Sequence, residues 1–230
     1  QTVGKKYLTE KNRMVFTLMP EVETPKTDAP KAAVSANVTA QQVIDNYAAA
    51  LGGKSKLEAV KTVKTLSTIK VMGMEIEAIT LEMAPNKSKA VQKIMGQEMV
   101  QVFDGEKGYM MQAGQRMDLP APAIEEAKKK RLFEVLSYNA ADFKTVEKVT
   151  EEGKELYLLA GAGKKLYFDT KTNLLVKSTS DKGDMVILDY MEVDGIKFPK
   201  NIKLAMMGQN MEMTNNQVIV NKEVSAEDFK

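Results

Sequence analysis

Between residues 68 and 114, short apolar runs alternate with turn signals along the chain. Within one run, Met74, Ile76 and Ala78 are separated by glutamates, which is the pattern of a half-buried strand. Short strands joined by Gly- and Asn-containing turns predict an antiparallel meander. The turn signals are Met72-Gly73, Pro85-Asn86, Gly96-Gln97, Asp104-Gly105 and Gly114-Gln115.

Residues 143–220 repeat this pattern, with hairpin turns predicted at Asp169–Asn173 and Asp194-Gly195. Pro199 lies inside one of the runs and indicates a strand edge or a bulge, because proline cannot donate a ladder hydrogen bond. Strands and helices do not alternate as they do in βαβ units. We therefore predict an α+β fold in which about eleven strands form one long antiparallel sheet.

Two helices are predicted ahead of the sheet. The first begins at Thr39, which has the capping-box spacing to Gln42, and ends at Gly52-Gly53. A second, short helix is predicted over residues 55–60, and both helices are expected to cover one face of the sheet. The apolar residues of the first helix share one side: Val43, Ile44, Tyr47, Ala48 and Leu51.

Residues 1–37 differ in composition from the rest of the chain. Residues 20–37 contain three prolines, mixed charges and small residues, and such a segment cannot bury enough apolar surface to order itself. We predict an N-terminal strand-like tail and a linker over 1–37, followed by one domain over 38–230. The chain starts at Gln1 without a hydrophobic leader, so we expect a mature chain or a piece of a longer one.

Composition excludes several classes of function. The 33 basic and 31 acidic residues give a net charge of +2, too small to indicate a nucleic-acid partner. Cysteine and histidine are absent, which argues against a disulfide framework, a thiolate zinc site and Ser-His catalysis. No apolar run reaches about 18 residues, so no transmembrane segment is predicted. We expect a protein that is not an enzyme and that holds no metal and no cofactor.

Methionine is abundant, with 16 residues in 230. A methionine side chain either fills an irregular gap in the core or contributes to an adaptable apolar surface for ligands, and both interpretations stay open for any one residue. The clustering along the predicted strands favours a ligand surface. The ligand-binding residues predicted on this basis are Met72, Met74, Ile76, Met99, Phe103, Met111, Met207, Met211 and Met213.

Two segments carry a resemblance to a known family. They are KLYFDTKTNLLV at 165–176 and DYMEVDGIKFP at 189–199, which follow the capped helix and the interrupted meander. Over residues 38–225 the chain resembles the LolA/LolB-like outer-membrane lipoprotein-sorting superfamily, in particular its Bacteroidetes-type relatives. The resemblance implies an unclosed β-barrel whose concave face is covered by helices, a periplasmic location, and an apolar hollow that accepts lipid or lipoprotein acyl chains. It also implies an arginine contact, for which Arg116 is the candidate.

A third helix is predicted over residues 118–137, with Pro120 and Pro122 at its entrance, where proline is tolerated. A helix inserted in a meander is either a plain crossover or a lid. We expect residues 121–137 to move as a cover over the sheet. Its cations, Lys128–Arg131, are either a solvated face or a contact for anionic headgroups or an acidic partner. The predicted lid residues are Ile124, Leu132, Val135 and Leu136.

Residues 7–20, YLTEKNRMVFTLMP, resemble the closing strand of an M16-type zinc-peptidase domain. This resemblance implies that the chain is the C-terminal appendage of a peptidase-like protein. The alternative function is then an accessory or protein-interaction domain attached to that module. The His-x-x-Glu-His motif of that family is absent, so no protease activity is implied for this chain.

Overall fold

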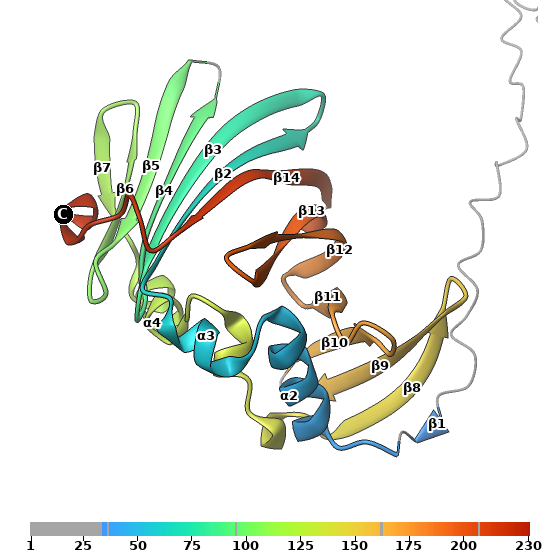
Figure 1. The fold of residues 1–230 in the computed structure, drawn as a ribbon. Helices are drawn as coiled ribbons and strands as arrows, with labels where there is room; N and C mark the ends of the chain where they lie inside the picture. The colour runs from blue at the N-terminus through green and yellow to red at the C-terminus, as the bar shows by residue number, and fades with distance from the viewer. Residues whose placement is uncertain (1–33, 36, 95, 162, 207) are drawn as a thin grey trace, which may run out of the picture.

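The computed structural model describes residues 34–35, 37–94, 96–161, 163–206 and 208–230, and its strands form one 14-stranded sheet (Figure 1). Every neighbouring pair of strands is antiparallel. The strands are β1 Val34–Ser35, β2 Thr62–Val71, β3 Met74–Met83, β4 Lys87–Ile94, β5 Gln97–Phe103, β6 Gly108–Gln112, β7 Gln115–Asp118, β8 Thr145–Glu151, β9 Lys154–Gly161, β10 Lys164–Asp169, β11 Leu175–Ser180, β12 Gly183–Val193, β13 Ile196–Met206 and β14 Gln209–Val220.

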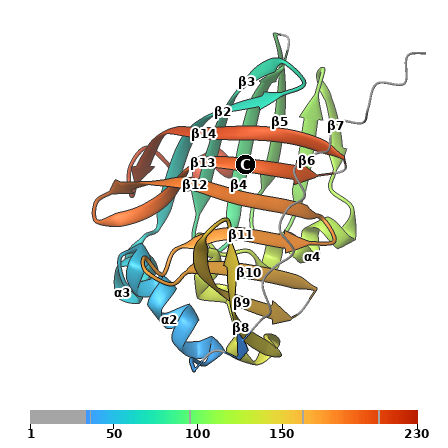
Figure 2. The same cartoon turned by 90° about the vertical axis from the view of Figure 1, so that its right-hand side faces the viewer.

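The sheet consists of two meanders, β2–β7 and β8–β14, joined where β14 pairs with β2. The outermost strands are β1 and β7, which do not pair with each other, so the sheet is curved and open rather than closed (Figures 1 and 2). The crossover between the meanders, residues 119–144, leads from the β7 edge to β8 near the opposite edge. It carries α4 Ala121–Lys129 and the 3-10 turns η2 Glu134–Ser137 and η3 Ala140–Asp142.

The helices α2 Ala40–Leu51 and α3 Lys54–Ala59 pack on the inner side of the curved sheet (Figure 1). The predicted capping box is confirmed, because Thr39 Oγ1 accepts from Gln42 N and Gln42 Oε1 accepts from Thr39 N. Gly52 ends α2 at a φ of 134°, a conformation that favours glycine. The predicted apolar face is buried in full: Val43, Ile44, Tyr47, Ala48 and Leu51.

Other local predictions are confirmed. Asp169 Oδ1 accepts from the backbone N–H groups of Lys171 and Thr172, which closes the turn before β11. Asp194 and Gly195 both have positive φ, as a two-residue hairpin requires. The register between β12 and β13 shifts beside Pro199, where a bulge was expected.

Two details of the prediction are corrected. The described residues form 14 strands instead of about eleven, because short edge strands such as β1 and β7 were not recognised. The helix predicted over 118–137 is not continuous: α4 ends at Lys129, and Lys130 is extended with a ψ of 146°. After this break Phe133 and Val135 enter the main core, and their burial takes precedence over the helical spacing of the sequence.

The division of the chain at residue 37 remains a prediction, because residues 1–33 and 36 lie outside the described part of the structure. The strand-like tail and the segment that resembles a peptidase strand lie there. In the part that is described, no helix has the length and apolar character needed to cross a membrane.

Candidate functional site

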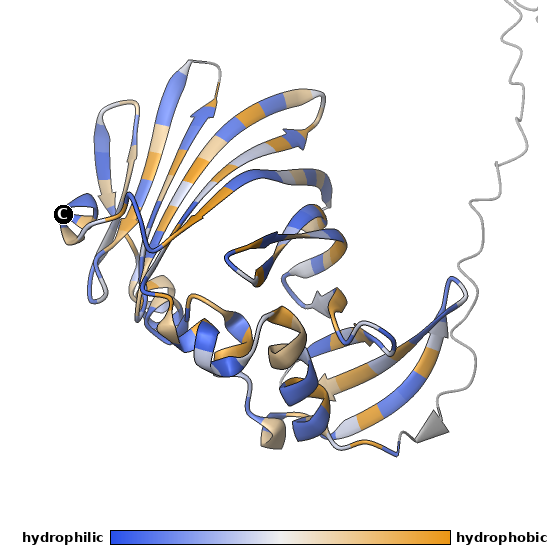
Figure 3. Ribbon diagram, viewed as in Figure 1, coloured by the Kyte–Doolittle hydropathy of each residue, from blue (hydrophilic) through white to orange (hydrophobic). Residues whose placement is uncertain are grey.

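The inner face of the sheet is the face whose side chains pack with α2, and Val63, Ile187 and Val218 lie on it. Side chains alternate between faces along each strand, and directly paired residues share a face. Hydrophobic and hydrophilic residues alternate visibly along several strands (Figure 3). The registers therefore assign every strand residue to the inner or the outer face.

Two uninterrupted apolar rows cross the inner face from β12 to β3, and together we name them the inner strip. At β12 they begin beside the main core, since Ile187 belongs to that core and Met185 packs against it. Each step within a row is a direct pairing of residues on neighbouring strands. The first row is Ile187, Ile202, Met213, Ile69 and Ile76, and the second is Met185, Leu204, Met211, Val71 and Met74.

The two rows of the inner strip differ in exposure. Ile187, Ile202 and Ile76 in the first row are buried at 5%, 6% and 8% exposure. In the second row Met74 is 36% exposed and the other four residues are partly exposed. The first row is therefore the more buried, with four isoleucines and Met213, and the second row, which has three methionines, presents more flexible side chains to a ligand.

A buried polar group closes one side of the inner strip. Ser67 and Asn215 face each other across β2 and β14, and Ser67 Oγ donates to Asn215 Oδ1 at 2.7 Å. Asn215 Nδ2 donates to the carbonyl oxygen of Pro199 at 2.7 Å, beside the bulge between Asn215 and Gln217. All three groups are satisfied, so this contact fixes the register that aligns the two apolar rows.

The structure brings four of the predicted ligand residues into the inner strip: Met74, Ile76, Met211 and Met213. Met99 also lies on the inner face, on β5, in the neighbouring row that contains Ser67 and Gln92. Phe103 is on the same face but is 1% exposed, so it belongs to the packed end of the strands. Their role in ligand binding remains a prediction.

The other predicted ligand residues lie elsewhere. Met72 is in the β2–β3 turn at a φ of 50° and is 76% exposed. Met111 pairs with Val100 and Arg116 on the outer face, while its neighbour Met110 is on the inner face. Met207 lies outside the described residues. Two adjacent methionines on a short strand gave no sequence signal to decide which one faces inward.

Sequence reasoning missed six members of the inner strip. They are on β2, β12 and β13, strands that had been predicted. The β12–β13 hairpin pairs four of them with one another, but the β2 residues join the rows only through the pairing of β14 with β2, which no local pattern shows. Alternation along each of these strands does give the correct face once one buried residue is known. The missed residues are Ile69, Val71, Met185, Ile187, Ile202 and Leu204.

The predicted lid is divided by the break at Lys130. Val135 is in the main core, and Leu132 and Leu136 pack against that core. Ile124 lies on α4, which has no buried residue. Only α4 therefore keeps the features expected of a cover, and a lid role for it remains a prediction.

Polar contacts tie α4 to two separate parts of the sheet. Lys130 Nζ, directly after the helix, lies 2.9 Å from Glu82 Oε1 on β3, and Asn86 Nδ2 donates to the Lys128 carbonyl oxygen at 3.3 Å. Lys182, in the turn between β11 and β12, pairs with Glu126. The helix thus bridges the β2–β7 meander and the β11–β12 turn. Two of the four cations considered for headgroup binding, Lys128 and Lys130, form ion pairs within the protein.

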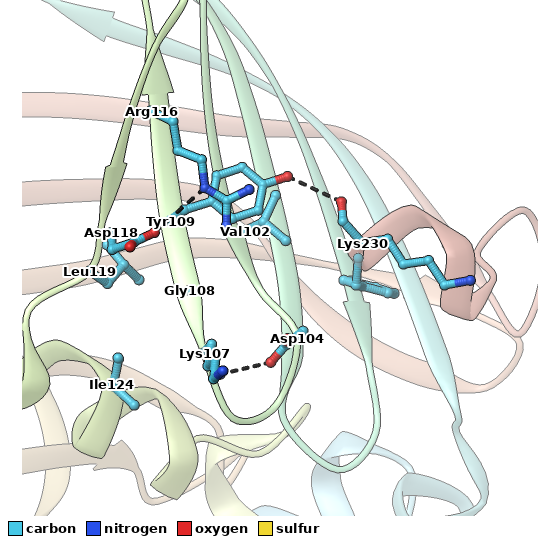
Figure 4. A pocket seen from close by; sticks show the side chains of 11 residues that line it. Val102, Asp104, Lys107, Gly108, Tyr109, Arg116, Asp118, Leu119, Ile124 and Lys230 are labelled. Atoms are coloured by element: carbon cyan, nitrogen blue, oxygen red, sulfur yellow. Dashed lines mark hydrogen bonds and ion pairs between the residues drawn. The ribbon is translucent and has the colours of Figure 1, made fainter.

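Arg116 is on the outer face of the sheet, and its guanidinium carbon lies 3.9 Å from the centre of the Tyr109 ring (Figure 4). Its Nε is 3.5 Å from Asp118 Oδ1. Arg116 therefore faces away from the inner strip and cannot contact a ligand bound there.

Three tyrosines, the buried Tyr47 and the partly buried Tyr138 and Tyr190, lie where α2, the crossover and β12 meet, and we name them the core tyrosines. Burial raises the pKa of Tyr47 to about 12 and also raises the pKa values of Tyr138 and Tyr190. Tyr190 donates its hydroxyl hydrogen to the Leu175 carbonyl at 2.8 Å. At neutral pH all three are therefore uncharged, and they join the helix layer to the sheet.

Within the described residues, no group of three or more Asp and Glu side chains is placed to hold a metal ion. The chemistry that the inner face offers is apolar contact. Its polar groups, such as Ser67 and Asn215, already bond to each other and to the backbone.

No protein-family model matches the chain, and no curated protein matches its sequence. Solved structures are similar in fold. A DUF1329 family protein from Desulfovibrio piger is 8% identical with a TM-score of 0.54, over 83% of this chain and 97% of the other. A putative outer membrane lipoprotein-sorting protein domain from Vibrio parahaemolyticus is 9% identical with a TM-score of 0.51, over 83% and 97% of the two chains. The expected fold of the lipoprotein-sorting proteins, an open and curved antiparallel sheet, is thus confirmed.

Proposed function

We propose that the protein is a non-catalytic carrier of an apolar ligand in the periplasm, and that it binds the acyl chain of a lipid or lipoprotein along the inner strip. The observation that carries the proposal is the pair of unbroken apolar rows, the second of which has no buried residue. A contiguous apolar surface on a soluble domain is typical of a ligand or partner site. The lipoprotein-sorting domain of similar fold gives further support.

The energetics favour a site that needs a cover. A fully buried methylene contributes about 0.8 kcal/mol, so ten methylenes contribute about 8 kcal/mol before the cost of association. An open strip contacts only one side of the chain, which leaves on the order of 4 kcal/mol before the same cost, so the net affinity is weaker than about millimolar. Tight binding therefore requires a second surface over the acyl chain. We propose α4 as that surface, because it spans from the β2–β7 meander to the β11–β12 turn.

A matched pair of methionines tests the position of the site. Met74 on the inner strip is 36% exposed and Met111 on the outer face is 39% exposed, so the two substitutions remove similar apolar surface. We expect Met74→Gln, alone or with Met211→Gln, to weaken binding of a fluorescent fatty acid severalfold. Met111→Gln is expected to leave that binding unchanged.

Native mass spectrometry after mild purification gives an independent measurement, with a bound lipid as the expected result. Equal losses from the inner and outer substitutions would contradict the assignment of the inner strip. Absence of any lipid uptake by the folded protein, in both measurements, would contradict the carrier function itself.

A further inference from the structure

A cavity, which we name the edge pocket, lies at the β7 edge of the sheet, separate from the inner strip (Figure 4). It has a volume of about 450 Å³, within the ~300–1,000 Å³ usual for small-molecule sites. Its walls come from β5–β7, from α4 and from the C-terminal 3-10 turn η4 Ala226–Phe229. Val102 and Tyr109 pair with each other on the outer face, so the cavity does not open onto the apolar rows.

The deepest part of this edge pocket is apolar. Val102 is 1% exposed and Phe229 is 2% exposed, and Leu119 and Ile124 complete the apolar lining. The wall that carries Phe229 is held in place: Ser225 N donates to Asp228 Oδ2 at 2.7 Å. The Tyr109 hydroxyl also donates to the Lys230 carbonyl oxygen at 3.1 Å. The pocket is therefore a formed cavity with room for a hydrocarbon chain.

The rim of the edge pocket carries charge of both signs, but the acids already have partners. Asp104 Oδ1 accepts from the backbone N–H groups of Lys107 and Glu106 at 2.7 and 2.8 Å, and these bonds lower the pKa of Asp104. Lys230 pairs with Glu227. Arg116 contacts Asp118 through Nε, at 3.5 Å, which leaves the terminal guanidinium nitrogens as donors.

Stacking fixes the direction of these donors. The guanidinium of Arg116 lies over the Tyr109 ring at 3.9 Å, and the ring edge in turn is tied to Lys230 through the tyrosine hydroxyl. A planar guanidinium recognises a carboxylate through two parallel hydrogen bonds. The side chain of Lys107 adds a second positive charge at the rim.

We propose that the edge pocket binds a small anionic amphiphile, a carboxylate with a medium-length hydrocarbon chain. The chain lies on Val102, Leu119, Ile124 and Phe229, and the carboxylate meets Arg116. This site is separate from the inner strip, so the proposal does not depend on the carrier function.

The test uses octanoate as the anionic probe, octan-1-ol as its uncharged match and octyltrimethylammonium as its cationic match. Binding to the full chain is followed by NMR of the methyl groups of Leu, Ile, Val and Met. We expect octanoate to shift the signals of Leu119 and Ile124 before those of Met74 and Met213, which report on the inner strip. We expect octyltrimethylammonium to bind more weakly than octanoate.

Substitutions separate the contribution of the charge from that of the apolar lining. We expect Arg116→Gln to weaken octanoate binding about tenfold and to change octan-1-ol binding less than about twofold. Ile124→Ser is expected to weaken both probes, and the sheet should stay folded because α4 has no buried residue. The control Arg131→Gln removes an equal charge from a residue outside the pocket and should change neither probe.

Three results would overturn the proposal. One is that octanoate shifts only the inner-strip methionines. The second is that Arg116→Gln and Arg131→Gln have equal effects on octanoate. The third is that the cationic probe binds as tightly as the anionic probe.

Discussion

The helix α4 is expected to open locally while the sheet stays folded. None of its residues is buried, and its ties to the sheet are the Glu82–Lys130 and Glu126–Lys182 ion pairs and one hydrogen bond from Asn86. Segments with few buried apolar contacts open at a lower free energy than core strands. The perturbation is therefore Glu82→Gln combined with Glu126→Gln, which removes both ion pairs and keeps the side-chain shapes.

The expected change in the opening equilibrium of α4 follows from the exposure of the side chains in the two ion pairs. The Lys130 side chain is 59% exposed and that of Glu82 is 20% exposed, so this pair is worth about 0.5–1 kcal/mol. Its loss raises the opening equilibrium of α4 about two- to fivefold. The Glu126–Lys182 pair is fully solvated and adds a smaller, salt-sensitive increment in the same direction.

Hydrogen exchange followed by mass spectrometry measures this opening directly. We expect peptides over 119–131 to exchange faster in the double variant and in high salt, with no change over β5 and β6. The control Glu212→Gln breaks the Lys203–Glu212 pair on the outer face, whose side chains are 55% and 62% exposed, and should leave 119–131 unaffected. Protection of α4 equal to that of β5, unaltered by the double substitution, would show that α4 is a fixed structural element.

Three further predictions concern stability. Asn215→Ala leaves the Pro199 carbonyl without its buried donor and is expected to cost about 1–3 kcal/mol in urea unfolding, whereas a cost near zero would mean that water replaces the amide. Leu132→Ala with Leu136→Ala should lower the stability of the whole domain, since both pack on the main core; a change confined to α4 would contradict this. The raised pKa of Tyr47, about 12, means that the unfolded chain loses protons first, so its contribution is complete below about pH 10 and is lost toward pH 12. Urea unfolding across that range should show the loss, and Tyr47→Phe should reduce its slope.

The parts of the fold that were predictable are those with local causes. The capping box at Thr39 and the turns at Asp169 and Asp194 depend on residues a few positions apart, and each is present as expected. The prediction of one helix over 118–137 was wrong because Phe133 packs in the core, which is a tertiary effect. Assigning Met111 to the inner face failed for a related reason, since the face of a short strand is set by register.

The inner strip itself shows why sequence alone could not define the site. Each row crosses five strands, and the step that joins the two meanders is the pairing of β14 with β2, two strands that are far apart in the sequence. A shift of one residue at this junction would turn Met211 and Met213 to the outer face. The Asn215 bulge lies at that junction and bonds to both Ser67 and Pro199, on the strands to either side of it. The polar contact therefore determines which apolar residues line the site, although its own atoms offer nothing to an apolar ligand.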